Sequence, residues 1–236
     1  MPVVQFGTQT IEYEITLMPR KTLAISVHPD LSVTVKVPEG TAPDKIVQKV
    51  QQRAAWIRKQ QRQFEIFLPD VPPRQYVSGE SHRYLGRQYR LKVIETLASA
   101  PEHIHLTRQF LEVHVHDKTS AHVREVVSAW YHTQAHQIFQ ESLSACLPKF
   151  ARDNLPAPSI VIRRMQSSWG SCSSKGTISL NIKLIQAPKE YIDYVLTHEL
   201  CHLKQLNHGS EFYELLSRVM PNWQEKKEKL DRFDFG

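Results

Sequence analysis

The sequence predicts an α+β fold, and three patterns along the chain support that prediction. Apolar and polar residues alternate through the first forty residues, as they do in half-buried antiparallel strands. Two stretches, at about 43–67 and 119–147, instead place apolar residues at helical spacing. A third helical stretch opens at Pro188 and carries the motif His-Glu-x-x-His at residues 198–202. We therefore expect an N-terminal antiparallel β-meander with a helix, followed by a C-terminal module built around the motif-bearing helix.

Length, composition and cysteine content limit the class of protein. The chain has 236 residues, of which 41% are hydrophobic, so one large domain or two small ones could bury a core. No apolar run is long enough to cross a bilayer, and the N-terminus lacks the apolar core of a signal peptide. The three cysteines are sparse and indicate reduced thiols. We expect a cytoplasmic protein that does not contact membranes, and its oligomeric state stays open.

The N-terminal strands are predicted from three alternating runs. Pro19 and Pro29 interrupt the alternation, and Pro38 ends it. Short breaks between successive runs favour an antiparallel meander with one face in water. The apolar positions are Ile11, Tyr13, Ile15 and Leu17, then Leu23, Ile25 and Val27, then Val33, Val35 and Val37.

The helix predicted at about 43–67 carries many basic residues. They could bind a nucleotide or a nucleic acid, as the formal net charge of +6 and the pI near 9.2 would allow. They also spread around the helix and alternate with glutamines, which favours an ordinary solvated surface. Both interpretations stay open at this point. The basic residues are Lys45, Lys49, Arg53, Arg58, Lys59 and Arg62.

A proline-rich linker and a region of hairpins follow this helix. The linker spans 68–73, so we predict parts at residues 1–73, 74–118 and 119–236, the middle one packing on either neighbour. One hairpin is expected around Gly86, and a second joins residues 103–105 to 113–116. Histidines alternate with apolar residues in the second hairpin. Since no cysteine or carboxylate joins them at ligand spacing, we expect them to face solvent.

The long helix predicted at about 119–147 carries a pair of histidines four residues apart, His132 and His136. They fall opposite its apolar stripe and no glutamate follows the first, so we expect them to be exposed. Strands are predicted at 160–163 and 178–184, on either side of a loop at 166–176. The helix that opens at Pro188 is expected to bury a stripe reaching Leu203 and Leu206.

The motif-bearing helix holds the strongest candidate site. His198 and His202 lie one above the other on a helix face, where both imidazoles can reach one Zn²⁺. His208 follows a turn later as a possible third ligand. Glu199 is placed to contact a metal-bound water instead of the metal. Three protein ligands and an open position are typical of one catalytic zinc ion per chain.

Four further residues are candidates for supporting roles. A hydrolytic site needs a donor for the oxyanion that forms during the reaction. Tyr191 and Tyr194 precede His198 on the same helix, and Arg163 ends the strand before the loop. Simple packing is the alternative for both tyrosines. Asn181 could orient a ligand or the backbone, and a structural capping role is an equal alternative.

Four segments of the C-terminal half form a combination more specific than the His-Glu-x-x-His motif. They are residues 164–172, 178–181, 198–208 and 221–223. Together they resemble the YgjP-like metallopeptidases, which are zincins related more loosely to SprT-like proteases. The resemblance implies a zincin-like module in which His198, His202 and His208 bind zinc and Glu199 is the base. It also implies that a substrate peptide adds to a sheet edge, which we place at Ile178–Leu184.

These observations leave three functional hypotheses. The leading one is a zinc-dependent metallopeptidase that acts on peptides or proteins. The second is a metal-dependent nucleoside triphosphate pyrophosphatase, in which Arg163, Arg164 and Lys183 receive the nucleotide. Against it, the chain has no P-loop and no acidic cluster for Mg²⁺. The third is a DNA-associated, SprT-like protease or binding module, whose DNA binding would depend on salt.

Overall fold

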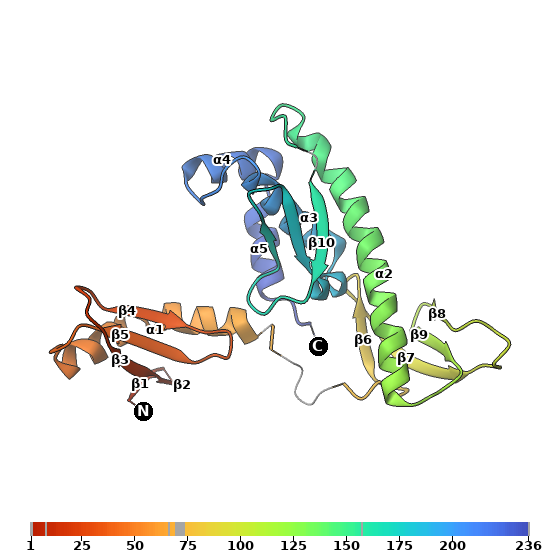
Figure 1. Cartoon of the computed structure of the whole chain (residues 1–236), viewed down its shortest axis with the longest axis horizontal. Coiled ribbons are helices and arrows are strands. Elements are labelled where there is room, and N and C mark those ends of the chain that lie inside the picture. The colour runs from red at the N-terminus through yellow and green to blue at the C-terminus, as the bar shows by residue number, and fades with distance from the viewer. Residues whose placement is uncertain (1, 8, 66, 69–73, 157, 236) are drawn as a thin grey trace. The chain divides into compact units, whose positions relative to one another are not determined.

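A computed structural model of the chain describes residues 2–7, 9–65, 67–68, 74–156 and 158–235. The chain forms two compact units, Met1–Pro69 and Asp70–Gly236 (Figure 1). Residues 74–118, whose placement the sequence left open, therefore belong to the second unit. Most of the predicted linker, residues 69–73, lies outside the described residues. Within the described residues, no helix combines the length and apolar character that a bilayer crossing requires.

The first unit packs one helix against two small sheets. β1 (Val3–Phe6) and β2 (Gln9–Glu12) form an antiparallel pair. β3 (Glu14–Leu17), β4 (Ala24–Val27) and β5 (Val33–Val37) form a second sheet in the order β3-β5-β4. Every second residue of β5 is buried against the apolar face of α1 (Pro43–Glu65), which includes Val50 and Ile57.

The prediction of a wholly antiparallel meander is wrong. β3 runs parallel to β5, with Ile15 opposite Val35, and only β4 is antiparallel to β5. Alternation along a strand identifies its buried face but does not identify its neighbour or direction. The predicted first run is also divided, because the Tyr13 N–H donates to the Pro2 carbonyl between β2 and β3.

The second unit begins with a four-stranded sheet in the order β6-β7-β9-β8. Its strands are β6 (Ser81–Tyr84), β7 (Arg87–Glu95), β8 (His103–Leu106) and β9 (Phe110–Val115). Both predicted hairpins are present, and β7 and β9 pair in parallel between them. The imidazoles of His103 and His114, opposite each other in β8 and β9, stack at 4.4 Å between ring centroids.

The β6–β7 turn helps to place the motif-bearing helix. Leu85 and Gly86 both have positive φ, 46° and 81°, as the commonest two-residue hairpin turn requires. Their N–H groups donate to the carbonyls of Ile185 and Gln186. A Cβ at position 86 would lie 2.7 Å from Cγ of Pro188, so glycine allows the turn to contact the helix start.

Among the described residues, four α-helices, two 3₁₀ helices and a three-stranded sheet complete the second unit (Figure 1). The sheet has the order β10-β12-β11, with β10 parallel and β11 antiparallel to β12. The α-helices are α2 (Ser120–Cys146), α3 (Lys189–His202), α4 (Ser210–Val219) and α5 (Trp223–Asp231). The strands are β10 (Ser159–Arg163), β11 (Gly170–Cys172) and β12 (Thr177–Asn181). The two 3₁₀ helices are Leu147–Phe150 and Ile182–Gln186.

Two predicted elements end earlier in the structure than expected. The strand expected to reach Leu184 stops at Asn181, whose side chain accepts a hydrogen bond from the Lys183 N–H and starts the 3₁₀ helix. This strand, β12, is also the central strand of its sheet, so the edge predicted at Ile178–Leu184 is wrong. The motif-bearing helix ends at His202, and Leu206 is 73% exposed instead of belonging to its buried stripe.

Candidate metal centre

Three imidazoles meet at the C-terminal end of α3. His198 and His202 project from successive turns of the helix, with ring centroids 5.0 Å apart. His208 comes from the loop between α3 and α4, and its Nε2 lies 3.0 Å from Nε2 of His198. One ring nitrogen from each of the three side chains lies within 4.8 Å of the others. Local helix geometry positions the first two histidines, whereas the fold of the loop positions the third.

The rings of the three histidines rest on Phe212, a fully buried residue in the first turn of α4. Its ring centroid lies 4.9 Å from that of His198 and 4.7 Å from those of His202 and His208. The Gln205 carbonyl lies 3.0 Å from Nδ1 of His202. When Nδ1 donates to that carbonyl, Nε2 keeps its lone pair for a metal.

The electrostatics of the cluster fit a divalent metal ion. Burial, followed by the neighbouring histidines, lowers the pKa of His198 to about 3, and burial also lowers the pKa of His208. Neutral imidazole is the form that binds metals. The buried Nδ1 of His198 has no hydrogen-bond partner among the described residues. Three imidazoles whose ring nitrogens converge at this distance would be held together by a shared cation.

Glu199 lies beside the histidines and is only 5% exposed. Burial raises the pKa of its carboxyl group to about 8, and burial is the one cause of this shift. The carboxylate lies against the backbone of Gly170 in β11, where an added Cβ would be 2.8 Å from Oε1. β11 therefore closes one side of a carboxylate that no cation of the described residues neutralises.

The two tyrosines of α3 have different surroundings. The ring of Tyr194 lies edge-on to His198, at 6.2 Å between centroids, and burial raises the pKa of its hydroxyl group. The ring of Tyr191 instead packs edge-on against Phe233, near the C-terminus, at 6.0 Å. Both tyrosines are buried. Of the two, Tyr194 is the one in contact with a candidate ligand.

Asn181 and Arg163 lie side by side where β12 and β10 end. Asn181 is fully buried, and its side-chain amide donates to the carbonyls of Met165 and Ser168, both at 3.0 Å. These bonds hold the loop that leads into β11. Asn181 therefore influences the site by positioning Gly170, and not by contact with the imidazoles. Arg163 is exposed at the strand end.

Residues beyond the predicted set also hold the site in place. Asp153 is nearly buried and accepts hydrogen bonds from Lys204 at 2.7 Å and from Arg218 at 2.6 and 2.8 Å. Lys204 begins the loop that carries His208, and Arg218 belongs to α4. Asp153 thus ties the loop to the helix that supports the histidines. The apolar face of α4 could have indicated Phe212 from sequence, and Gly170 lies in the segment 164–172 that carries the family resemblance, but its contact with Glu199 and the role of Asp153 were not predicted.

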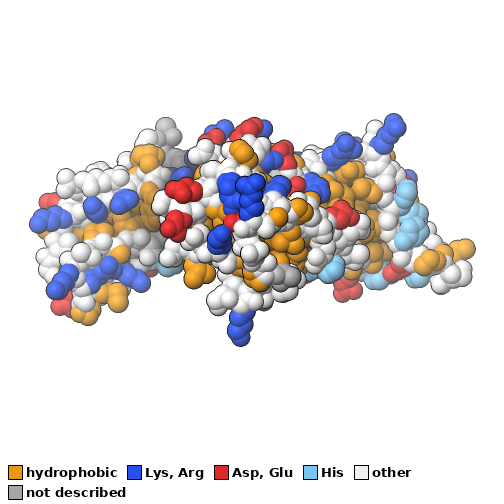
Figure 2. All heavy atoms as spheres, turned by 90° about the horizontal axis from the view of Figure 1, so that it is seen from above, with side chains coloured by type: hydrophobic (Ala, Val, Ile, Leu, Met, Phe, Trp, Pro, Cys, Tyr) orange, Lys and Arg blue, Asp and Glu red, His pale blue; other side chains and the backbone are white. Residues whose placement is uncertain are grey.

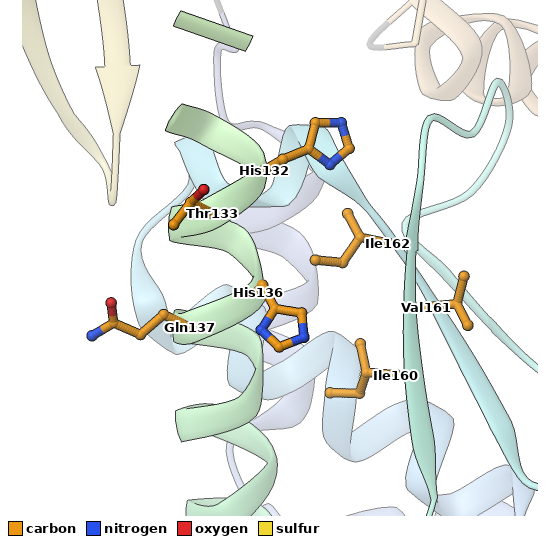
Figure 3. A pocket seen from close by; sticks show the side chains of 7 residues that line it. All are labelled: His132, Thr133, His136, Gln137, Ile160, Val161 and Ile162. Carbon is orange, nitrogen blue, oxygen red and sulfur yellow. The ribbon is translucent and has the colours of Figure 1, made fainter. Parts of the chain in front are cut away.

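The second histidine pair lies apart from this group of ligands. His132 and His136 are exposed on α2, as predicted, and project toward β10 (Figure 3). They line a cavity of about 700 Å³ together with Thr133, Gln137 and the strand residues 160–162. None of these described residues offers a carboxylate or a thiolate, so the pair has no third ligand here.

A comparison with protein families identifies the family of this chain. The family described as YgjP-like, metallopeptidase domain, matches residues 21–233. The crystal structure of the metallopeptidase zymogen of Pyrococcus abyssi abylysin is similar at 26% sequence identity, over 39% of this chain and 90% of that chain, with a TM-score of 0.36. The search of curated proteins found no match. Since the family match covers nearly the whole chain and includes every candidate ligand, the chain belongs to the YgjP-like metallopeptidase family.

Proposed function

We propose that this protein is a zinc-dependent metallopeptidase in which His198, His202 and His208 hold one zinc ion and Glu199 is the general base. The observation that carries the proposal is the convergence of three imidazole nitrogens within 4.8 Å, beside a buried carboxylate. Family membership supports the class of reaction, and the three imidazole ligands support zinc as the metal.

Glu199 is suited to proton transfer. When bound, zinc supplies a Lewis acid that polarises the scissile carbonyl and makes water a better nucleophile at neutral pH. Glu199 accepts a proton from the attacking water and delivers it to the leaving amine. Burial raises the pKa of this carboxyl group above its usual range, and a cation bound beside it would lower that pKa again and leave the carboxylate free to accept the proton. β11 covers Glu199, so the proton that its carboxylate accepts is separated from bulk water.

Tyr194 is the best placed of the candidate oxyanion donors. A tyrosine hydroxyl is protonated at neutral pH, and burial raises the pKa of this one further, so it can donate to a developing negative charge. Its ring contacts His198, whereas Tyr191 contacts Phe233. Asn181 uses its amide to hold a loop, and Arg163 lies at an exposed strand end. We therefore assign the donor role to Tyr194 and a positioning role to Asn181.

The edge that receives substrate is best assigned to β11. This strand borders its sheet and passes the carboxylate of Glu199 at Gly170. An extended peptide that pairs with β11 would bring its backbone beside the general base. The assignment replaces the predicted edge at Ile178–Leu184 and keeps the same mode of substrate binding.

One observation favours a second candidate, the nucleoside triphosphate pyrophosphatase. Arg74, Arg164 and Lys183 line a cavity of about 200 Å³, and no acidic residue is among its described lining residues. Such a cavity suits a phosphate group. DNA association remains a prediction from the looser relation to SprT-like proteases and from the basic residues of α1.

The test measures hydrolysis of polypeptides and of nucleoside triphosphates, with the Glu199→Gln variant as the control for both. Zinc-loaded protein is incubated with an unfolded polypeptide and, in parallel, with nucleoside triphosphates, and the Glu199→Gln variant is treated identically. New polypeptide N-termini should form with the wild type and fall by roughly a hundred- to ten-thousandfold with the variant. Release of pyrophosphate without peptide cleavage would replace the proposal by the second candidate. Full activity of the variant would remove Glu199 as the base.

A further inference from the structure

The first unit contains a groove that the metal centre does not use. It has a volume of about 390 Å³ and lies between β4 and α1. On the helix side, its lining residues are spaced four and then three residues apart, so they follow one face of α1. The groove is lined by Leu23, Ala24 and Ile25 from the strand side and by Lys49, Arg53 and Trp56 from the helix.

The strand side of the groove is an open sheet edge. β4 is the last strand in the order β3-β5-β4, and its four residues are half-buried. On one side, β4 forms its backbone hydrogen bonds with β5. On the other side, no backbone hydrogen bond to β4 is formed by any described residue. The outward N–H and C=O groups of such an edge can pair with an added strand.

The helix side of the groove carries cations without counter-charges. Lys49 and Arg53 form no ion pair or side-chain hydrogen bond with any described residue. From Lys45 to Phe64, the helix contains no acidic residue that could pair with them at the spacing of one turn. Figure 2 shows Lys and Arg side chains distributed over the face of this unit that it presents, with hydrophobic side chains between them. The lining cations are therefore available to an acidic partner.

Trp56 adds an apolar contact to the same groove. Its side chain is 39% exposed, although its neighbours Ala54 and Ile57 are completely buried. A large aromatic side chain in a groove, next to a strand edge and two cations, offers a contact for an apolar side chain of a partner. Edge, charge and aromatic surface thus occur together within one groove.

We propose that this groove binds an extended acidic polypeptide segment, which adds to β4 as a further strand. Its backbone would pair with the β4 edge. Side chains alternate along an extended segment, so acidic residues can face Lys49 and Arg53 while apolar residues contact Trp56 and Ile25. A single-stranded nucleic acid would meet the cations but could not continue the ladder. The inference goes beyond the proposed hydrolysis, because binding here needs neither the metal nor Glu199.

Fluorescence anisotropy with the full chain tests the proposal. The Glu199→Gln background prevents cleavage of the probe, a labelled peptide of alternating Glu and Val residues. Lys49→Gln/Arg53→Gln should weaken binding by about tenfold, because two charged contacts at the groove are lost. Lys59→Gln/Arg62→Gln is the matched control: it removes the same charge from exposed positions of the same helix that do not line the groove, and should change binding little.

Two further probes separate strand addition from simple charge attraction. A peptide of the same sequence with N-methyl groups on alternate backbone nitrogens should bind at least about tenfold more weakly, since it cannot complete the ladder. An oligothymidylate of equal charge should bind more weakly than the acidic peptide. Equal weakening by both double variants, equal binding of the methylated peptide, or tighter binding of the oligothymidylate would each overturn the proposal. Circular dichroism confirms that each variant is folded.

Discussion

The contact between Gly170 and Glu199 limits which residue can occupy position 170. A Cβ at this position would lie 2.8 Å from Oε1 and 2.9 Å from Cγ of Glu199. Gly170 does not have a positive φ, so space and not backbone conformation requires glycine there. The strand that covers the Glu199 carboxylate thus also limits where that carboxylate can lie.

Gly170→Ala should impair catalysis while the metal stays bound. The added methyl group displaces the carboxylate of Glu199, and overpacking of this kind typically costs about 1–3 kcal/mol. We expect kcat to fall by roughly a hundredfold, as small displacements of catalytic groups can produce, with unchanged zinc content. The control is Gly209→Ala, close to His208 in sequence, because nothing lies within 4 Å of a Cβ there. Wild-type kcat for Gly170→Ala would show that Glu199 can move without loss of function.

At the level of single elements, α4 supports the candidate ligands through Phe212. This side chain is fully buried and contacts all three imidazoles. Phe212→Ala should destabilise the metal-free protein by about 3–5 kcal/mol and weaken zinc binding, because the rings lose the surface that orients them. Leu216→Ala is the control: Leu216 is equally buried one turn later in α4 and should cost about 2–5 kcal/mol without changing zinc affinity.

Denaturant titration and competition with a chelator measure these two effects separately. If both variants change zinc affinity to the same extent, the effect of Phe212 is one of general stability. If neither variant changes zinc affinity, α4 is not needed to orient the imidazoles.

Asp153 links the loop of His208 to α4 and predicts a pH dependence of stability. Hydrogen bonds from Arg218 and then Lys204 lower the pKa of its carboxyl group below the ordinary value. A lowered folded-state pKa stabilises the protein above the unfolded-state pKa, near 3.9, and this contribution is lost as the pH falls through the folded-state value.

Asp153→Asn should therefore destabilise the protein at neutral pH, by about 1–3 kcal/mol, since two cations lose a charged partner. The difference from wild type should shrink between neutral pH and an acidic pH below the lowered folded-state pKa of Asp153, where its carboxyl group is neutral. Denaturant midpoints at both pH values provide the measurement. Glu225→Gln breaks an exposed pair with Lys229 and should change the free energy of unfolding much less than Asp153→Asn does, because solvent screens the pair. A pH-independent difference for Asp153→Asn would mean that its charge is not what stabilises the fold.

The elements that the sequence predicted well are those with a long, regular period. α1 and α2 lie within two residues of the predicted ends, and both hairpins of the second unit are present. The direction of β3 was wrong because alternation does not distinguish parallel from antiparallel neighbours. The end of β12 was wrong because the hydrogen bond of the Asn181 side chain overrides the alternation that continues to Leu184.

Across the whole molecule, the described parts of the site belong to the second unit, yet they come from segments far apart in sequence. The spacing of His198 and His202 makes their proximity predictable, because one helix carries both. Phe212, Gly170 and Asp153 act through contacts between elements, and a single sequence without its fold does not contain those contacts. The sequence therefore identifies the chemistry of the site better than its supports.

We propose that three histidines hold one zinc ion and that Glu199 takes part in the reaction without binding the metal. Elemental analysis after dialysis tests it most directly, on the wild type, Glu199→Gln and His198→Ala/His202→Ala, each checked for folding by circular dichroism. We expect about one zinc per chain in the wild type and in Glu199→Gln, and almost none in the histidine variant. Undiminished zinc in the folded histidine variant, or loss of zinc in Glu199→Gln, would contradict the claim.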